Sequence, residues 1–251
     1  AVAGRIQEAG GEVTVAATVA EAVADCELVL TILFDADAVL AVADDIAANL
    51  PDGAVWVQSA TVGPDAARTI GGRAPGRVVD APVLGTRKPA EDGTLVVLAS
   101  GPADLVEAAG PALDAIGGRT LRVGDEIGQG SALKLACNAW VGLITAGTAQ
   151  SLALAEGLGV DPQLFLDAIE GGGADSPYAH IKGAAMLSGD TTPSFALDGV
   201  RKDFGLMREA AHGAGVRDEL LTTVLGLFDV ASEQGHGDDD LAAVYRAWDR
   251  S

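Results

Sequence analysis

The stretch Gly128-Gln-Gly-Ser-Ala-Leu-Lys134-Leu-Ala-Cys-Asn138 opens a long run of apolar and small side chains. Between residues 131 and 159 only Lys134 and Glu156 are charged. A helix that is apolar on all sides is usually buried between other parts of a protein rather than laid on a surface. The stretch therefore predicts a long buried helix over residues 131–158.

Lys134 is the conspicuous residue of this run. Burying an ammonium without a partner costs on the order of several kcal/mol, so a lysine in apolar surroundings tends to be paired, to lose its proton more easily or to face a cleft. Asn138 lies four residues on and shares the same helix face. The alternative is that Lys134, near the helix start, extends its amine to solvent. The helix alone does not decide between the two.

Upstream of this helix the chain alternates helix and strand. The predicted strands are residues 12–15, 27–33, 54–59, 77–81, 94–99 and 120–123, and the predicted helices are 1–10, 20–24, 37–50, a helix starting at Pro64, and 103–116. The apolar run 27–33 is typical of a fully buried parallel strand. This alternation predicts a doubly wound α/β domain that ends near Gly128.

Downstream of Gly128 no convincing strand remains. Helices are predicted at 131–158, 162–170, 178–187, 200–213, 218–233 and 241–248. The second half is therefore predicted to be an all-α domain.

The composition favours a small-molecule substrate. The 251 residues include 36 acidic and 16 basic side chains, a net charge of −20, which argues against binding nucleic acid or an anionic membrane.

Cys26 and Cys137 offer no disulfide framework and match a reducing compartment, so we expect a cytoplasmic protein. The three scattered histidines give no zinc-like spacing, so no metal is expected. We also find neither an apolar run of roughly 18 to 20 residues nor a secretory signal.

Other catalytic patterns are weak. Ser131-Ala-Leu-Lys134 matches the S-x-x-K of serine acyl-transferases, but the companion motifs S-D-N and K-T-G are absent. Ser131 is more simply interpreted as a helix N-cap. No G-x-S-x-G elbow is present, and the acidic pairs and triplets fit solvated turns.

Six segments occur in an order that resembles a known family. They are Thr31-Ile-Leu-Phe-Asp35, Ala60-Thr-Val-Gly-Pro64, Asp80-Ala-Pro-Val-Leu-Gly-Thr86 with Glu91-Asp-Gly-Thr-Leu95, Gly128 to Asn138, Lys202-Asp-Phe204, and Gly235-His-Gly-Asp-Asp-Asp240. They resemble T-M-L-P-D, S-T-V-S-P, D-A-P-V-S-G-G…G-T-L, G-x-G-x3-K-L-x2-N, K-D-L and G-x-G-x2-D of the β-hydroxyacid dehydrogenases. That family includes 3-hydroxyisobutyrate dehydrogenase and the glyoxylate/succinic semialdehyde reductases.

The resemblance implies a Rossmann-like α/β domain at residues 1–128 that binds NADP or NAD, with NADP slightly favoured. An all-α domain at 129–251, joined by the long interdomain helix, would close on the substrate. The apolar helices of this half also suggest burial against another subunit, so a homodimer or higher homo-oligomer is expected. The implied reaction transfers hydride between the nicotinamide and a small 3-hydroxy acid or its semialdehyde or keto partner.

The resemblance also implies site residues. Lys134 would be the general acid/base, since burial brings a lysine pKa towards working pH. Asn138 would hold Lys134 or the substrate, and Gly85 with Thr86 would donate backbone N–H groups to a substrate carboxylate. The full expected set is Lys134 for catalysis, Leu84, Gly85, Thr86 and Asn138 for substrate, and Leu33, Phe34, Thr61 and Lys202 for cofactor.

Several positions depart from the family pattern. Leu84 stands where a substrate-binding serine is expected, which favours a less polar or differently placed substrate. The glycine-rich turn would end just before Ala1, and a segment that contacts the adenosine ribose would lie between Val15 and Ala16. We expect the natural protein to carry both. Arg87 and Lys88 either attract a carboxylate or are two exposed charges on a loop.

Two alternatives remain at this stage. An imine reductase shares the fold but generally lacks the catalytic lysine. A non-catalytic dehydrogenase-like binding module would not need Lys134, which is present.

Overall fold

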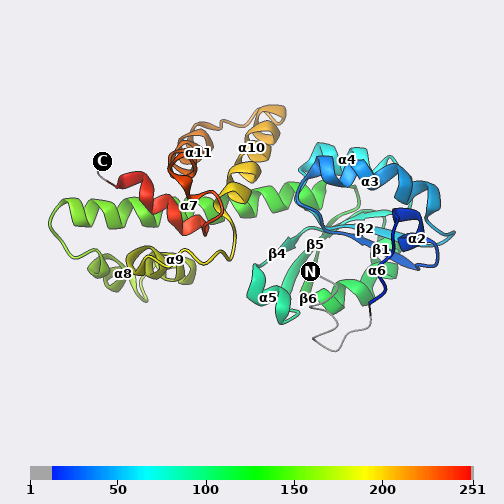
Figure 1. Cartoon of the computed structure of the whole chain (residues 1–251), viewed down its shortest axis with the longest axis horizontal. Coiled ribbons are helices and arrows are strands. Elements are labelled where there is room, and N and C mark those ends of the chain that lie inside the picture. The colour runs from blue at the N-terminus through cyan, green and yellow to red at the C-terminus, as the bar shows by residue number, and fades with distance from the viewer. Residues whose placement is uncertain (1–12, 250–251) are drawn as a thin grey trace. The chain divides into compact units, whose positions relative to one another are not determined.

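The computed structural model describes residues 13–249 (Figure 1). Within these residues the chain forms two compact units, one of residues 13–83 and 96–131 and the other of 84–95 and 132–249. Helix α7 (Gln129–Gly157) starts in the first unit and continues through the second. The predicted helix at 1–10 lies outside the described residues.

The sheet begins with three parallel strands, β1 (Leu28–Thr31), β2 (Val55–Gln58) and β3 (Val78–Asp80). Its order continues from β3 to β5 (Leu95–Ser100) and β4 (Val83–Leu84), and β6 (Gly117–Gly124) also pairs with β5. β5 runs antiparallel to β3, with Asp80 opposite Ser100. Except for β4, all of these strands lie where the sequence predicts them.

Helices cover both faces of β2, as the alternation of its side chains requires. Trp56 packs in one cluster with residues of α3 (Ala36–Asn49) and α4 (Pro64–Gly71). Val55 and Val57 pack in a second cluster with residues of α6 (Ala103–Ile116). Figure 1 shows α3 and α4 on one side of the strands and α6 on the other. The predicted doubly wound α/β fold is confirmed.

Two predictions for this unit are wrong. The run 27–33 is a parallel strand but not a fully buried one, because β1 lies at the edge of the described sheet and Leu30 is 40% exposed. The predicted strand at 12–15 is not formed by residues 13–15, and Glu12 lies outside the described residues. The short helix α2 (Val19–Val23) follows, with Thr18 as its N-cap.

The rest of the second unit is helical, as predicted. After α7 come α8 (Gln163–Ile169), α9 (Pro177–Ser188), α10 (Leu197–Gly213) and α11 (Glu219–Ala231). A π-helical turn (Ser232–His236) and a 3-10 helix (Leu241–Trp248) end the described chain. The predicted helix 218–233 corresponds to α11 and the first residues of the π-helical turn, in which Gly235 has φ 97°. The segment before β5 forms a short helix, α5 (Arg87–Glu91), which the sequence did not predict.

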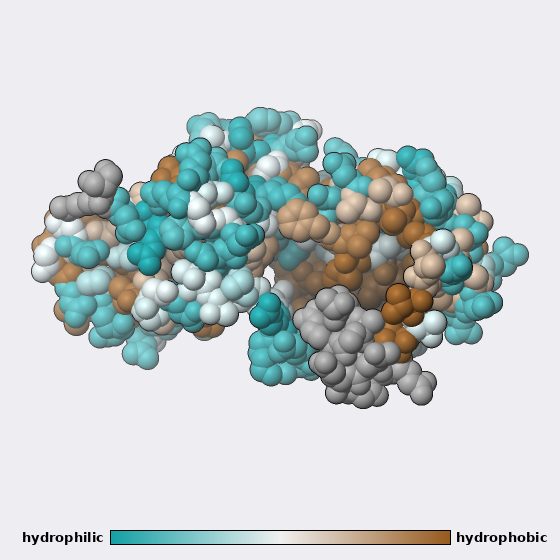
Figure 2. All heavy atoms as spheres, viewed as in Figure 1, coloured by the Kyte–Doolittle hydropathy of each residue, from teal (hydrophilic) through white to brown (hydrophobic). Residues whose placement is uncertain are grey.

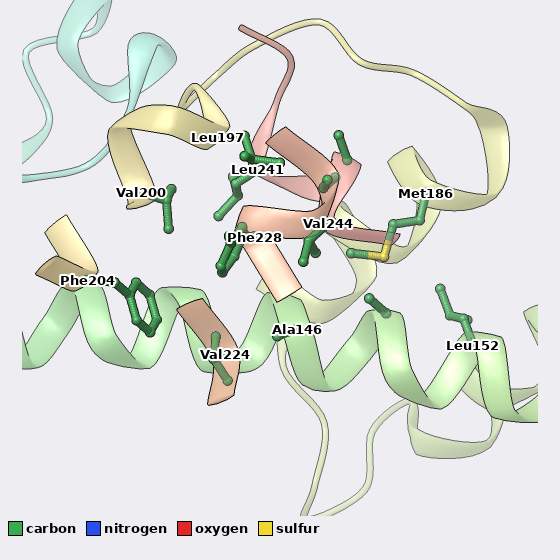
Figure 3. Packing of buried hydrophobic residues seen from close by; sticks show 14 of the residues in the cluster. Ala146, Leu152, Met186, Leu197, Val200, Phe204, Val224, Phe228, Leu241 and Val244 are labelled. Atoms are coloured by element: carbon green, nitrogen blue, oxygen red, sulfur yellow. The ribbon is translucent and has the colours of Figure 1, made fainter. Parts of the chain in front are cut away.

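One face of α7 packs against the hydrophobic core of the second unit (Figure 3). Phe204 and Phe228 meet there with ring centroids 5.7 Å apart. Gly142 lets Phe204 lie close against α7, since a Cβ on Gly142 would lie 2.3 Å from Phe204 Cε2. The opposite face of α7 is not covered in the described chain: Trp140 is 64% exposed and Leu154 56%. The expectation of a helix buried on all sides therefore holds for one face only.

Apolar residues also gather at the surface of the first unit, on the face seen in Figure 2. In the part of the chain that the structure describes, no helix has both the length and the apolar character needed to cross a bilayer.

Candidate functional site

Lys134 lies in the second turn of α7 and is 9% exposed. Within residues 13–249 its ammonium makes no hydrogen bond or ion pair. Burial lowers the pKa of Lys134 below its usual range. The negative charge of Asp203 opposes this effect, and the positive charge of Lys202 adds to it. The alternative of a lysine extended into solvent is therefore wrong.

Asn138, one turn beyond Lys134, is tied to α10. Its Nδ2 donates a 2.6 Å hydrogen bond to Asp203 Oδ2, and both side chains are buried. Lys202 Nζ lies 3.0 Å from the other carboxylate oxygen of Asp203. The structure thus brings together Lys134, Asn138 and Lys202, three predicted site residues, around one carboxylate.

Asp203 has no predicted role of its own, although it belongs to the Lys202-Asp-Phe204 motif. The sequence does contain a signal for Asp203. It is a carboxylate on the apolar face of an amphipathic helix, near Val200, Phe204 and Met207. A carboxylate at such a position needs a partner. Here the partners come from Asn138 and from the neighbouring Lys202.

A second buried carboxylate fixes the start of α7. Asp80, at the end of β3, accepts hydrogen bonds from Gly128 N (3.0 Å), Ser131 N (2.8 Å) and Ser131 Oγ (2.7 Å). Burial raises the pKa of the Asp80 carboxyl, and these hydrogen bonds oppose that effect. The Asp80 carboxylate, which belongs to β3, therefore caps the N-terminus of α7. The helix dipole also favours a negative charge at this end of the helix.

This arrangement explains the glycines of the Gly128-x-Gly130 pattern. Gly128 has φ 99°, and a Cβ on Gly130 would lie 2.3 Å from the Leu98 carbonyl oxygen. It also corrects the interpretation of Ser131, which lies inside the first turn rather than at the N-cap. Its hydroxyl proton goes to Asp80 and not to Lys134, which leaves the S-x-x-K interpretation without support.

The expected cofactor residues of the first unit lie beyond the carboxyl ends of β1 and β2. Leu33 and Phe34 are exposed side chains directly after β1. Thr61 follows β2 and is half-buried, in a turn that reaches α4 through Gly63 at φ 80°. The carboxyl ends of parallel strands are where nucleotides bind in open α/β sheets. Exposed apolar side chains beside a tight backbone turn fit the flat rings of a dinucleotide.

Lys202, the fourth expected cofactor residue, belongs to the second unit. Besides its contact with Asp203, it lines a hollow of about 430 Å³ along α10, together with Gly205, Leu206, Arg208, Glu209 and His212.

The expected substrate residues Leu84, Gly85 and Thr86 lie in the segment 84–95, which belongs to the same unit as Lys134 and Asn138. Gly85 has φ 120°, and a Cβ there would lie 2.7 Å from Leu95 Cδ2 and 2.9 Å from Pro89 Cβ. Only glycine fits this position. Arg87 and Lys88 are exposed on α5 rather than on a loop, and Lys88 pairs with Asp92.

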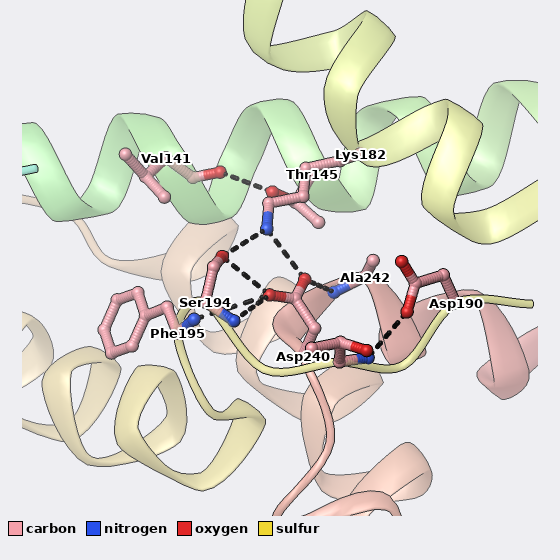
Figure 4. A network of polar contacts seen from close by, with 9 residues as sticks. Val141, Thr145, Lys182, Asp190, Ser194, Phe195, Asp240 and Ala242 are labelled. Carbon is pink, nitrogen blue, oxygen red and sulfur yellow. Dashed lines mark hydrogen bonds and ion pairs between the residues drawn. The ribbon is translucent and has the colours of Figure 1, made fainter. Parts of the chain in front are cut away.

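The last sequence motif ends in Asp240, which lies in a buried network (Figure 4). Lys182 Nζ lies 2.7 Å from Asp240 Oδ1, and Ser194 donates to Oδ2 through its N and its Oγ. Asp240 also caps the 3-10 helix by accepting from Ala242 N. The network holds the segment before α10 against the end of the chain. No group of three or more potential metal ligands occurs in residues 13–249.

Comparison with known proteins gives the family. The model of the NAD binding domain of 6-phosphogluconate dehydrogenase matches residues 2–124, and the NAD-binding model of NADP-dependent 3-hydroxyisobutyrate dehydrogenase matches 128–248. The chain is 33% identical over 248 residues to L-threonate dehydrogenase of Cupriavidus necator, covering 96% of this chain and 83% of that protein. The chain belongs to the β-hydroxyacid dehydrogenase family.

Two further members of the β-hydroxyacid dehydrogenase family agree with this. Glyoxylate/succinic semialdehyde reductase 1 of Arabidopsis thaliana is 30% identical, over 91% of this chain and 81% of that protein. A solved 3-hydroxyisobutyrate dehydrogenase from Salmonella typhimurium has a TM-score of 0.85 and 28% identity, covering 95% of this chain and 85% of that one. The chain is therefore an NAD(P)-dependent oxidoreductase, as the sequence predicted.

Imine reductases share the fold of this β-hydroxyacid dehydrogenase. Their solved structures have TM-scores of 0.54 to 0.56 and 19 to 22% identity. These values are lower than those of the 3-hydroxyisobutyrate dehydrogenase and bear on the fold alone.

Proposed function

We propose that this enzyme transfers hydride between NAD(P) and a small 3-hydroxy acid or its semialdehyde or keto partner, with Lys134 as general acid/base. The observation that carries the proposal is the state of Lys134. It is a buried ammonium with no partner in the described chain, one turn from the Asn138–Asp203 pair. A lysine with a lowered pKa is suited to taking up and returning a proton near neutral pH.

The bound nicotinamide supplies or accepts the hydride, and the chain must handle the proton. In the direction of reduction Lys134 gives a proton to the carbonyl oxygen of the substrate; in oxidation it removes the hydroxyl proton. Asn138 uses its N–H on Asp203, so its carbonyl oxygen is the acceptor left for the Lys134 ammonium or a substrate hydroxyl. Asp203 acts through its negative charge, which opposes the loss of the proton from Lys134.

For the cofactor, we propose contacts from Leu33, Phe34 and Thr61 in the first unit and from Lys202 in the second. The first unit would bind the dinucleotide, and the second would close on the substrate. NADP is slightly favoured over NAD. The position of Leu33 and Phe34 beyond the carboxyl end of β1 supports this assignment, because open α/β sheets bind nucleotides at the carboxyl ends of their strands.

For the substrate, we propose a carboxylate-bearing hydroxy acid or aldehyde. The named relatives act on L-threonate, glyoxylate and succinic semialdehyde, each of which carries a carboxylate. The backbone N–H groups of Gly85 and Thr86, Asn138 and the exposed Arg87 would meet this group. Leu84, in place of a hydroxyl, would lie against an apolar part of the substrate.

The test follows NADH and NADPH oxidation with glyoxylate, succinic semialdehyde and a cyclic imine, and NAD⁺ and NADP⁺ reduction with L-threonate and 3-hydroxyisobutyrate. Lys134→Ala should lower kcat by about 10²-fold or more while leaving NAD(P)H binding intact. Lys134→Arg is the matched control, since it keeps the charge but cannot release the proton, and it should be equally impaired. Full activity in either variant would remove Lys134 from the mechanism. Activity on the imine alone would favour an imine reductase.

We also propose a cytoplasmic homodimer or higher homo-oligomer. The two free cysteines, Cys26 and Cys137, suit a reducing compartment. Exposed residues form a stripe along one face of α7, namely Ala132, Ala136, Trp140, Gly147 and Leu154. Their spacing of four or seven residues keeps them on one side of the helix. Light scattering should give a dimer or larger species for the wild type and a smaller one for Trp140→Glu. A wild-type monomer would contradict this.

A further inference from the structure

The carboxyl ends of β1 and β2 are joined by three buried side chains. Trp56 Nε1 donates a 3.1 Å hydrogen bond to Thr31 Oγ1, and Thr31 Oγ1 donates a 3.1 Å hydrogen bond to Gln58 Oε1. Thr31 and Gln58 lie opposite each other in the parallel register, each as the last residue of its strand. All three side chains lie within the first unit.

The direction of this chain of hydrogen bonds is fixed. An indole N–H can only donate, so the Thr31 hydroxyl must accept from Trp56 and has one proton left for Gln58. Gln58 Oε1 also accepts from Ala60 N at 3.1 Å, and Gln58 Nε2 donates to Ala60 O at 2.7 Å. A single orientation of the Gln58 amide satisfies all of these bonds, so Thr31 and Ala60 together set its orientation.

The segment that these hydrogen bonds hold, residues 54–63, is almost entirely buried. From residue 54 to 63 every residue is buried except Thr61. The Gln58 amide binds both backbone groups of Ala60, the residue directly before Thr61. Thr31 in turn directly precedes the exposed run that contains Leu33 and Phe34, and its carbonyl accepts from Ser59 N at 2.8 Å. The hydrogen bonds among Trp56, Thr31 and Gln58 therefore hold both of the turns that follow β1 and β2.

We infer that Gln58, oriented by Thr31 and Trp56, is a positioning residue for the dinucleotide: it fixes the turn that presents Thr61 and ties it to the Leu33–Phe34 segment. Gln58 is itself buried and acts through Thr61. The inference rests on the proposed function, in which these residues contact the cofactor. If the three side chains served packing alone, their loss would lower stability without changing dinucleotide affinity.

The experiment compares Thr31→Val, which keeps the shape but removes the hydroxyl, with Thr31→Ser, which restores it. In the full chain, NADH and NADPH binding is followed by nicotinamide fluorescence, with cofactor KM, kcat and Tm measured alongside. Thr31→Val should raise Kd and cofactor KM about tenfold, the effect of one buried hydrogen bond, and change kcat less than about threefold. Thr31→Ser should return Kd to within about threefold of the wild type.

A lower Tm with unchanged Kd and KM in Thr31→Val would overturn the inference while leaving the proposed function in place. A wild type that binds neither NADH nor NADPH would overturn both. Should Thr31→Val fail to fold, Trp56→Phe gives a second comparison, because it removes the first donor together with part of a buried ring, and Tm measured alongside Kd reports the loss of packing. We expect that variant to raise Kd about threefold, and an unchanged Kd would count against the inference.

Discussion

The side-chain amide of Asn138 donates a 2.6 Å hydrogen bond to the carboxylate of Asp203, which joins α7 to α10 one turn from Lys134. The carboxylate is buried and has Lys202 at its other oxygen. Asp203 is thus placed to act on Lys134 through its charge, and Lys202 partly offsets that charge. The protonation of Lys134 depends on this balance.

Removing the charge of Asp203 should shift the pH dependence of the reaction. The Asp203 carboxylate raises the pKa of Lys134 against the lowering effect of burial, so Asp203→Asn should lower that pKa further. In the direction of reduction the protonated amine is required, and it is lost as pH rises through the pKa. The alkaline limb of kcat against pH should therefore move to lower pH. An unmoved limb would mean that Asp203 acts on structure alone.

Two glycines inside helices should respond in opposite ways to alanine. Gly142→Ala places a methyl group against the buried Phe204 ring and should lower the free energy of unfolding by about 1 to 3 kcal/mol. Gly226→Ala, on the exposed face of α11, meets open space and should raise the free energy of unfolding by about 0.5 to 1 kcal/mol, since alanine favours the helix. Urea denaturation of both variants measures the difference. Equal effects would refute the packing argument.

The cap that Asp80 provides should be needed for the start of α7. Asp80→Asn replaces one acceptor oxygen with a donor that faces the N–H groups of Gly128 and Ser131. We expect a loss of about 2 to 3 kcal/mol in the free energy of unfolding, against about 1 kcal/mol for Ser131→Ala, which removes one hydroxyl. Hydrogen exchange at residues 128–132 should be faster in Asp80→Asn. Similar losses in the two variants would contradict the cap.

The buried Lys182–Asp240 pair should make stability fall at acid pH. Burial alone would raise the pKa of the Asp240 carboxyl, but hydrogen bonds from Lys182, Ala242 and Ser194 outweigh it and hold the pKa below its usual range. A lowered folded-state pKa contributes stability that is present above about pH 4, the unfolded value, and is lost as pH falls below it.

Variants of this pair separate charge from packing. Lys182→Met leaves a buried, unpaired carboxylate and should cost about 3 to 5 kcal/mol at pH 7. Lys182→Met with Asp240→Asn should cost less than the two changes added together. Denaturation at pH 7 and near pH 3 should also show a smaller acid loss in Asp240→Asn than in the wild type. Simple additivity would show that the two side chains are not coupled.

Patterns along the sequence predicted the elements well where the signal is local. Pro64 starts α4 as expected, α6 has the predicted bounds, and α7 begins two residues earlier than predicted. The helix α5 was missed because five residues are too few for a helical period to be recognised. The exposure of Leu30 could not be predicted, because it depends on which strands and helices flank β1.

The hydrogen-bonded partners at the candidate site were missed for one physical reason, which is that they lie far apart in the sequence. Asp80 and Ser131 are 51 positions apart, and Asn138 and Asp203 are 65 apart. A spacing rule identifies partners one helical turn away, but it carries no information on which strand or helix folds back onto another. Lys134 could be singled out because the apolar residues that mark it as buried lie in its own helix. Its neighbours in space could not.

The chain contains four lysines, and three of them have a carboxylate within ion-pairing distance: Lys88 with Asp92, Lys182 with Asp240 and Lys202 with Asp203. Lys134 has none in the described residues, and burial lowers its pKa. A lowered pKa increases the share of free amine on Lys134, the form that attacks aldehydes and activated esters. The residue proposed to move the proton is therefore also a point of attachment for a covalent inhibitor, whereas each of the other three lysines lies in an ion pair.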